Sequence, residues 1–434
     1  MRTPGEGETA LPSSLAEPSR TEPVPAEQAV PGPRRRPAVV LGVGGGIAAY
    51  KACELLRLFT ESGHDVRVVP TRQALRFVGE PTWAALSGNP VAADVWESVH
   101  EVPHVRIGQG ADLVVVAPAT ADLLARAAHG LADDLLTNTL LTARCPVVLA
   151  PAMHTEMWEH PATRANVATL RERGTLVVEP AVGRLTGADT GRGRLPDPVE
   201  IFEFCRGVLA GRPADLAGRR LVVSAGGTRE AIDPVRFLGN RSSGLQGYAL
   251  ARTALARGAE VTLVAANVTL PDPAGATVVR VESALELREA VLKAAEEADA
   301  VVMAAAVADF RPARRNESKV KKTSADPDPI HLVKNPDILA ELGERRRQGE
   351  GPSPRVIVGF AAETDDVLAN GQAKLARKGC DLLVVNQVGE NLAFGTPDNA
   401  AVVLASEGGR VEIPRGPKEA LADVVWDLVA ERLA

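Results

Sequence analysis

Short runs of Val, Leu and Ala alternate with segments of helical period along most of this chain. Parallel strands that are buried on both faces read as continuous apolar runs, and helices join them, so this alternation predicts doubly wound α/β domains. The expected strands lie at 38–43, 66–70, 113–117, 147–150, 221–224, 261–265, 300–304, 356–360 and 382–386. The expected helices lie at 47–61, 122–128, 247–257, 284–298 and 418–433.

The stretch 211–218 is loop-like in composition and separates two such patterns. We therefore expect two Rossmann-like domains, at 37–212 and 217–434. Residues 1–36 are rich in Pro, Glu, Ala and Ser and carry almost no large apolar side chains, which predicts a disordered extension. Its glutamates and its lack of an apolar core argue against a transit peptide or a secretory signal.

The charge and cysteine content exclude several classes of protein. The net charge of −6 gives no general affinity for nucleic acid or for an anionic membrane, and no apolar run has the length of a membrane helix. The four cysteines are scattered and form no C-x-x-C pair, so they read as reduced thiols. We expect a cytoplasmic enzyme that acts on small molecules.

The first expected strand runs into the glycine-rich turn Gly42–Lys51, which contains G-x-G-x-x-A. This pattern alone would suggest NAD, but NAD sites need a carboxylate about 20 residues further on, and the second strand ends without one. Thr71 and Thr120 instead follow expected strands and offer hydroxyls to a phosphate monoester. Flavin mononucleotide (FMN) therefore fits better than NAD, and glycines that serve only close packing are the alternative.

A second glycine turn, Ser224–Glu230, follows the strand at 221–224. Free backbone N–H groups and the next helix N-terminus favour an anion there. Asn240, Ser242 and Ser243 come shortly after and can hydrogen-bond to phosphates without adding charge. The turn predicts a nucleotide site.

Small residues end the strand at 300–304, which continues as Met303-Ala-Ala-Ala-Val-Ala-Asp-Phe310. Such a strand end lets a flat base approach the backbone, while Asp309 can reach a sugar or a metal ion. Lys374 and Lys378 are four residues apart in a helical stretch, where their repulsion is unfavourable unless an anion compensates it. An ordinary solvated helix face is the alternative for this pair.

His100-Glu-Val-Pro-His104 satisfies the H-E-x-x-H zinc signature in form. That signature needs both histidines inside one helix, and an interior proline breaks a helix. Pro103 therefore argues against zinc.

The segment Asp233-Pro-Val-Arg-Phe-Leu-Gly-Asn-Arg-Ser-Ser-Gly244 resembles the phosphopantothenate–cysteine ligase family over about residues 217–434. The resemblance implies CTP as co-substrate, Mg²⁺ or another divalent cation, Asn240 and Lys319 as catalytic residues, and Asp309 as the metal ligand. The nucleotide-binding residues that it implies are Gly226, Gly227, Ala305, Ala306, Asp309, Lys319, Asn335, Pro336, Asp337, Ile338, Phe360, Lys374 and Lys378. Leu245 stands where family members often carry Lys.

Residues 38–210 resemble the FMN-containing cysteine decarboxylases through the turn Gly44–Lys51, Pro118-Ala-Thr-Ala-Asp122 and Pro151-Ala-Met-His-Thr-Glu-Met-Trp158. The resemblance implies His104 as a catalytic residue, with a core or surface histidine as the alternative, and places Met153 and His154 beside the substrate. The FMN-binding residues that it implies are Gly45, Gly46, Ile47, Thr71, Pro118, Thr120 and Met153. Gly187 stands where a cysteine proton donor is expected, so His154 or a bound water is expected to donate the proton instead.

Together the two halves resemble the bifunctional enzymes of coenzyme A synthesis. Such an enzyme joins cysteine to 4′-phosphopantothenate through an acyl cytidylate, and then decarboxylates the product with FMN. The family's decarboxylase halves form trimers and its ligase halves form dimers, which implies a homo-oligomer. The rival interpretations are a peptidyl-cysteine decarboxylase and a non-catalytic regulatory flavoprotein, and neither accounts for the second half. Preference for CTP over ATP is left open.

Overall fold

The computed structural model describes residues 36–91, 103–185, 189–211, 214–320, 329–349, 351–363, 367–387 and 398–434. The predicted extension, 1–36, lies outside these ranges except for Arg36. In the described part of the chain, no helix has the length and apolar character needed to cross a bilayer.

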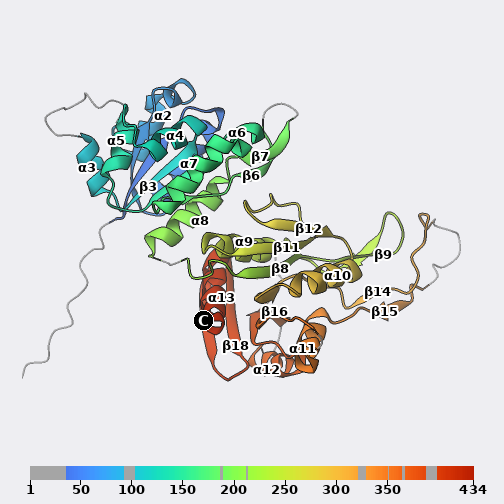
Figure 1. Ribbon diagram of the computed structural model, residues 1–434. Coiled ribbons are helices and arrows are strands. Elements are labelled where there is room, and N and C mark those ends of the chain that lie inside the picture. The colour runs from blue at the N-terminus through green and yellow to red at the C-terminus, as the bar shows by residue number, and fades with distance from the viewer. Residues whose placement is uncertain are drawn as a thin grey trace, which may run out of the picture. The chain divides into compact units, whose positions relative to one another are not determined.

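The first half, residues 37–210, is built on a parallel five-stranded sheet with strand order β2-β1-β3-β4-β5 (Figure 1). This is the flavodoxin-like order, in which the chain reverses its winding direction between β1 and β3. The sheet strands are β1 (Ala38–Val43), β2 (Asp65–Pro70), β3 (Leu113–Ala119), β4 (Val147–Pro151) and β5 (Leu176–Val177), and β6 (Ala181–Arg184) and β7 (Thr190–Arg194) form a separate antiparallel hairpin. The helices are η1 (Ile47–Lys51), α1 (Ala52–Glu61), η2 (Ala74–Arg76), α2 (Glu80–Ser87), α3 (Pro103–Gly110), α4 (Ala121–His129), α5 (Leu135–Thr142), α6 (Thr155–Glu159), α7 (Pro161–Glu172) and α8 (Pro198–Leu209).

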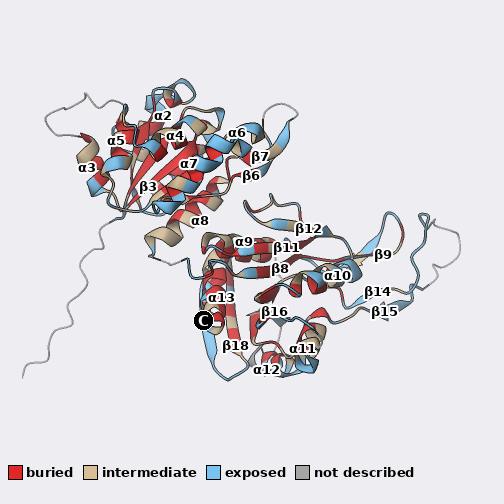
Figure 2. Ribbon diagram, viewed as in Figure 1, coloured by how far each residue is buried: buried red, intermediate tan, exposed pale blue. Residues whose placement is uncertain are grey.

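Apolar side chains cover both faces of this sheet, and β3 is buried along its whole length (Figure 2). Phe59 of α1 and Ile201 of α8 belong to the core on one face. Leu123 of α4 and Val167 of α7 belong to the core on the other. Burial on both faces explains why β3 reads as an unbroken apolar run in the sequence.

The second half, residues 216–434, contains an eight-stranded sheet with strand order β12-β11-β8-β13-β16-β17-β18-β19. The first six strands in that order are parallel and follow the Rossmann order 3-2-1-4-5-6, with the winding reversal between β8 and β13. β18 and β19 extend the sheet with antiparallel pairing. The predicted fold class, two doubly wound Rossmann-like domains of which the first is flavodoxin-like, is confirmed.

The sheet strands of this half are β8 (Arg220–Gly226), β11 (Glu260–Ala266), β12 (Thr277–Val281), β13 (Ala300–Met303), β16 (Val356–Glu363), β17 (Leu382–Gln387), β18 (Asp398–Ala405) and β19 (Arg410–Pro417). Two small antiparallel pairs join β9 (Arg229–Ala231) to β10 (Phe237–Gly239) and β14 (Phe310–Pro312) to β15 (Leu332–Lys334). The helices are α9 (Leu245–Ala256), α10 (Ala284–Ala295), α11 (Ile338–Gln348), α12 (Val367–Lys378) and α13 (Lys418–Leu433).

The helices of the second half divide between two cores, one on each face of the sheet. The first core contains Tyr248 of α9 and Trp426 of α13, both fully buried, and the indole N–H of Trp426 donates to the carbonyl oxygen of Leu250 at 2.9 Å. The second contains Leu287 of α10, Leu342 of α11 and Leu375 of α12. Side chains from α9 and α13 therefore approach the carboxyl edge of the sheet from one face, and those from α11 and α12 from the other.

Candidate active sites

The glycine turn after β1 is held against the strand ends on either side of it. The Gly44 N–H donates to the carbonyl oxygen of Pro118, which lies on β3, at 3.0 Å. A Cβ at Gly44 would lie 2.4 Å from that oxygen, and a Cβ at Gly45 would lie 2.2 Å from the Cβ of Gln73. Only glycine fits at these two positions, and the turn lies at the β1/β3 reversal, where this fold class binds FMN.

Thr71 and Thr120 flank this turn from neighbouring strand ends. Thr71 is 4% exposed, and its hydroxyl oxygen accepts a hydrogen bond from the Ala74 N–H at 3.2 Å. Thr120 caps α4 by accepting from the Leu123 N–H at 3.3 Å, and its Cγ2 lies 3.8 Å from a Cβ built at Gly46. In both residues the hydroxyl oxygen is the acceptor, so the hydroxyl proton is left to donate to a phosphate oxygen. We call the turn Gly44–Gly46 with Thr71 and Thr120 the flavin cradle.

Met153 and His154 follow β4, next to the β6–β7 hairpin. The Met153 N–H donates to the carbonyl oxygen of Gly193 on β7 at 2.9 Å. His154 precedes the first residue of α6, and its carbonyl oxygen accepts from the N–H groups of Met157 and Trp158. His154 thus lies at the base of the hairpin whose tip, including Gly187, is outside the described residues.

His104 lies in the first turn of α3, which packs against α5. Its carbonyl oxygen accepts from the Thr142 hydroxyl at 2.8 Å, and its side-chain Nδ1 is buried with no hydrogen-bond partner among the described residues. Among the described residues, no hydrogen bond joins His104 to the flavin cradle. A buried imidazole nitrogen without a partner costs free energy, which a substrate group could recover.

The proline within the H-E-x-x-H pattern argues against zinc on sequence grounds. The described part of α3 runs from Pro103 to Gly110, and His100 and Glu101 lie outside the described residues. Within the described ranges, no group of three or more His, Cys, Asp or Glu side chains could hold a metal ion.

The second half has a cavity of about 980 Å³ at its β8/β13 reversal. Most of the residues predicted for the nucleotide and for catalysis line it together: Asn240, Ala305, Ala306, Asp309, Asn335, Pro336, Asp337, Ile338, Phe360, Lys374 and Lys378. They lie on β16 or in the segments that follow β10, β13, β15 and β16, which explains how residues far apart in sequence meet at one edge of the sheet. We call this space the strand-end cavity.

Hydrogen bonds fix several polar side chains of the strand-end cavity. The Asn240 amide donates to the carbonyl oxygen of Val307 at 2.9 Å, and the Asn335 amide donates to that of Ala308 at 2.8 Å. The backbone N–H of Asn335 donates to the Asp309 carbonyl oxygen at 2.9 Å. The segment 307–309 therefore holds both amides, and the exposed Asp309 carboxylate stands next to them.

A carboxylate balances the charge of one of the two lysines of α12, Lys374 and Lys378. Lys378 forms an ion pair with Asp337, whose carboxylate also caps α11 by accepting from the Ala340 N–H. Lys374 lines the same cavity one helical turn earlier. The arrangement differs from a solvated helix face because Lys378 is fixed toward the cavity by Asp337.

Three predicted residues do not line the strand-end cavity. Gly226, at φ 87°, and Gly227 form the backbone turn behind it, and Gly227 pairs with Ala306 in an isolated bridge. Lys319 is exposed in a segment held by the β9–β10 hairpin, because the next residue, Val320, donates its N–H to Asp233 at 3.2 Å. Burial alone would raise the pKa of Asp233, but hydrogen bonds from the Val235 N–H and from Arg236 outweigh it and hold that pKa well below its usual range.

Sequence reasoning missed seven polar residues that line the strand-end cavity, namely Arg241, Gln246, Lys334, Arg377, Asn386, Asn399 and Lys418. Asn386 could have been found, because it ends an apolar strand run at the carboxyl edge of the sheet. Lys418 follows β19, which pairs antiparallel at the edge of the sheet. The rule that ligands bind at the carboxyl ends of parallel strands therefore does not predict it.

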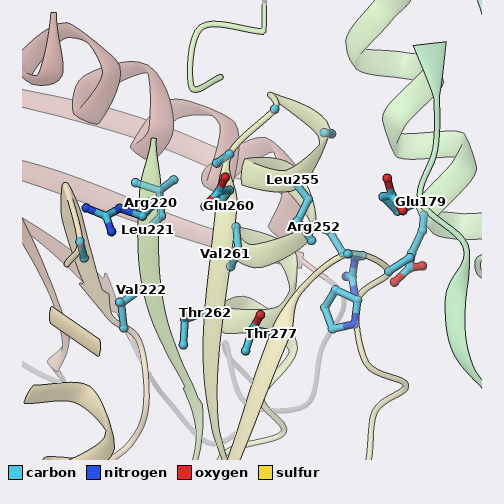
Figure 3. A pocket seen from close by; sticks show the side chains of 18 of the residues that line it. Glu179, Arg220, Leu221, Val222, Arg252, Leu255, Glu260, Val261, Thr262 and Thr277 are labelled. Carbon is cyan, nitrogen blue, oxygen red and sulfur yellow. The ribbon is translucent and has the colours of Figure 1, made fainter. Parts of the chain in front are cut away.

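A larger cavity, of about 1060 Å³, lies at the opposite edge of this sheet (Figure 3). Arg220, Glu260 and Thr277, the first residues of β8, β11 and β12, line it. Ligands of open α/β sheets bind at the carboxyl ends of the strands, so size alone does not make this cavity the nucleotide site.

Two family models match the chain. Residues 27–210 match the flavoprotein family, and residues 216–433 match the DNA/pantothenate metabolism flavoprotein C-terminal domain. The coenzyme A biosynthesis bifunctional protein CoaBC of Mycolicibacterium smegmatis is 59% identical over 403 residues, which cover 91% of this chain and 97% of that protein. The protein of the same name from Bacillus subtilis is 41% identical over 398 residues, covering 91% and 96%. A crystal structure of the C-terminal domain of a CoaBC protein matches 51% of this chain and 98% of that domain, at 34% identity and a TM-score of 0.43.

The fold and the matched models define a class of two-domain α/β proteins, with a flavoprotein half followed by a pantothenate-metabolism half. Within that class, the extent and identity of the match to curated relatives are decisive. The chain belongs to the CoaBC family of bifunctional coenzyme A biosynthesis proteins.

Proposed function

We propose that this chain catalyses two consecutive steps of coenzyme A synthesis. The second half ligates cysteine to 4′-phosphopantothenate with CTP, and the first half decarboxylates 4′-phosphopantothenoylcysteine to 4′-phosphopantetheine. The observation that carries the proposal is that one chain holds a flavin cradle at a flavodoxin-type reversal and a large polar cavity at a Rossmann-type reversal. Membership of the CoaBC family supports both activities.

The ligase half must activate a carboxylate that does not react by itself. Attack of the 4′-phosphopantothenate carboxylate on the α-phosphate of CTP forms an acyl–phosphate bond and breaks the bond to pyrophosphate. The cysteine amine then displaces CMP and loses a proton. Lys374 and Lys378 would neutralise the phosphates, Asp309 would hold Mg²⁺, which would supply further charge neutralisation, and Asn240 would donate to the acyl cytidylate without adding charge.

Decarboxylation in the flavin half requires an electron acceptor for the electron pair that stays behind when carbon dioxide leaves. Bound FMN would supply reversible hydride chemistry at the thiol-bearing carbon, which would make loss of carbon dioxide possible. The flavin cradle would hold the FMN phosphate through backbone N–H groups and the hydroxyls of Thr71 and Thr120. His104 would act on the thiol or carboxylate, Ile47 and Pro118 would contact the cofactor, and Met153 and His154 would contact the substrate.

We infer that the chain works in the cytoplasm as a homo-oligomer of decarboxylase trimers and ligase dimers, as the resemblance to its family implies. The exposed apolar side chains of Tyr50 and Phe77 in the first half, and of Phe237 in the second, support contacts with further subunits.

The test is incubation of the purified protein with 4′-phosphopantothenate, cysteine and Mg²⁺, with either CTP or ATP, and identification of the products by mass. We expect 4′-phosphopantetheine, carbon dioxide, CMP and pyrophosphate in the CTP reaction. Formation of AMP instead of CMP would reassign the nucleotide. No ligation with either nucleotide, together with decarboxylation of a peptide that ends in cysteine, would favour the peptidyl-cysteine decarboxylase.

A further inference from the structure

Thr228, in the glycine turn that follows β8, has a fully buried hydroxyl group. The residue is 0% exposed, and its hydroxyl oxygen accepts a hydrogen bond from the Ala308 N–H at 3.0 Å. Its backbone N–H donates to the carbonyl oxygen of Ala306 at 3.2 Å. Because β13 ends at Met303, the segment 306–308 has already left that strand. Thr228 therefore holds this segment by one side-chain bond and one backbone bond.

The peptide unit between Val307 and Ala308 is held at both of its polar groups. Its N–H donates to Thr228, and its carbonyl oxygen, that of Val307, accepts from the Asn240 amide at 2.9 Å. The N–H and the carbonyl of a trans peptide lie in one plane and point in opposite directions. When Thr228 fixes the N–H, it therefore also fixes the direction of the carbonyl that Asn240 contacts.

The bond to Val307 determines how the Asn240 amide is presented to the strand-end cavity. An asparagine amide carries two N–H donors and one acceptor oxygen. Val307 takes one donor, which leaves the second donor and the oxygen for a ligand in the cavity that Asn240 lines. Asn240 is exposed, and among the described residues its side chain forms no other hydrogen bond. The orientation of this amide thus depends on the Val307 carbonyl.

A hydroxyl group is needed at position 228 because of the Ala308 N–H. Threonine and valine have nearly the same shape, and a buried hydroxyl costs free energy unless it is hydrogen-bonded. In the part of the chain that the structure describes, the Ala308 N–H has no acceptor other than Thr228. Valine at this position would leave that buried N–H unpaired and free the peptide unit to turn.

Ser224, at the other end of the same turn, makes a bond of the same kind. Its hydroxyl oxygen accepts from the Ala305 N–H at 3.1 Å, and Ser224 is also 0% exposed. The carbonyl of that peptide unit belongs to Ala304, and the Asn240 amide donates to Val307 instead. Ser224 therefore holds the same segment without reaching Asn240, which makes it a matched comparison.

We propose that Thr228 is a positioning residue of the ligase half, whose hydroxyl oxygen fixes the Val307–Ala308 peptide and thereby orients the Asn240 amide for the acyl-cytidylate step. The proposal rests on the ligase activity proposed above. Thr228 is fully buried and does not line the strand-end cavity, so it acts through Asn240 and touches no substrate. Its loss should slow the reaction more than it weakens nucleotide binding.

The test compares wild type with Thr228→Val, which keeps the shape but lacks the acceptor, in steady-state ligation assays on the full chain. The kcat for ligation should fall roughly ten- to a hundredfold, as expected when a buried donor loses its partner, while the KM for CTP stays within about threefold. Thr228→Ser keeps the hydroxyl and should hold kcat within about threefold of wild type.

A double-mutant cycle with Asn240→Ala separates positioning from stability, because residues that act as one unit do not lose activity additively. If Thr228 acts through Asn240, Thr228→Val should cause little further loss in the Asn240→Ala background. Ser224→Ala is the matched control, and its effect should add to that of Asn240→Ala. Single-turnover rates of pyrophosphate release measure all these variants on one scale.

Thermal unfolding shows whether Thr228→Val is folded. If it is unfolded, Thr228→Cys takes its place, because a thiol sulfur is a weaker acceptor than a hydroxyl oxygen, and kcat should fall from Thr228→Ser to Thr228→Cys. Additive losses in the cycle, an unchanged kcat in the variant without the hydroxyl, or a loss in Thr228→Ser equal to that in Thr228→Val would overturn the proposal. Absence of ligation in wild type would instead overturn the proposed function on which it rests.

Discussion

Gly44 has no room for a side chain, because a Cβ there would meet the carbonyl oxygen of Pro118 at 2.4 Å. Gly44→Ala should therefore displace the turn after β1, destabilise the protein by about 1–3 kcal/mol and lower its FMN content. Flavin absorbance of the purified protein and its thermal unfolding measure the two effects. The matched control is Gly207→Ala on α8, where a Cβ would meet nothing within 4 Å. This control should leave stability unchanged or raise it by up to about 1 kcal/mol, and wild-type flavin content in Gly44→Ala would contradict the role of the turn.

His154 lies where a proton donor is needed if no cysteine stands at the hairpin tip. It lies at the base of the β6–β7 hairpin, next to the Met153–Gly193 hydrogen bond, and imidazole is the side chain that exchanges protons most readily near neutral pH. In anaerobic single turnover, His154→Asn should stall with reduced flavin and release an unsaturated thiol, lighter than 4′-phosphopantetheine by two hydrogens. Mass spectrometry and flavin absorbance read the two signals. Completion at the wild-type rate would leave His154 as a residue that only contacts substrate.

At the scale of elements, the capping of α5 makes stability of the first half depend on pH. Asp134 accepts hydrogen bonds from the Thr137 N–H and from Arg126, both at 2.8 Å. Burial alone would raise the pKa of Asp134, but these hydrogen bonds outweigh it and hold the pKa below its ordinary value. The charged form thus stabilises the fold above the ordinary carboxyl pKa, and that stabilisation is lost as the pH falls through the lower pKa of the folded state.

Asp134→Asn should accordingly cost about 0.5–1 kcal/mol near neutral pH, because it keeps a cap acceptor but loses the charge. Thermal unfolding between about pH 6 and pH 3 tests this. The difference in melting temperature between wild type and variant should shrink toward the acid end. A difference that stays constant across the range would show that the charge of Asp134 does not contribute.

The strands also show how much of the fold and of the strand-end cavity could be predicted from the sequence. β1, β3, β8 and β13 were predicted because each is buried on both faces and reads as a continuous apolar run. β19 was not predicted, because most of its residues are exposed at the edge of the sheet and its sequence, Arg410–Pro417, carries little apolar signal. The residues of the strand-end cavity that follow parallel strands were predictable for the same reason as the strands. Lys418 was not, because it reaches the cavity only through the unpredicted β18–β19 extension.

At the scale of the whole molecule, the two reactions should separate by mutation. His104→Asn should abolish carbon dioxide release but leave CMP production intact, and Asn240→Asp should do the reverse when 4′-phosphopantothenoylcysteine is supplied. The added negative charge of Asn240→Asp could cost several kcal/mol at the acyl-cytidylate step. Equal loss of both activities in a folded, yellow His104→Asn protein would contradict the division of labour.

A mixture of the two variants extends this test. Starting from 4′-phosphopantothenate, CTP and cysteine, the mixture should produce 4′-phosphopantetheine, because the ligation product can leave one molecule and enter another. Measurement of carbon dioxide release from carboxyl-labelled cysteine follows the transfer. An inactive mixture of two individually competent variants would show that the product is passed only within one molecule or one assembly.

The bond between Gln246 and Lys418 joins positions 172 residues apart, and α13 contributes Trp426 to the same core as α9. The order in which the chain leaves the ribosome therefore matters to its two activities. The first half has all its sheet strands once residue 177 has emerged, whereas part of the wall of the strand-end cavity and parts of both cores of the second half wait for residues 398–433. A nascent chain stalled within this last stretch would carry a complete flavin sheet and no closed ligase pocket, so late frameshifts should abolish coenzyme A synthesis at its ligation step.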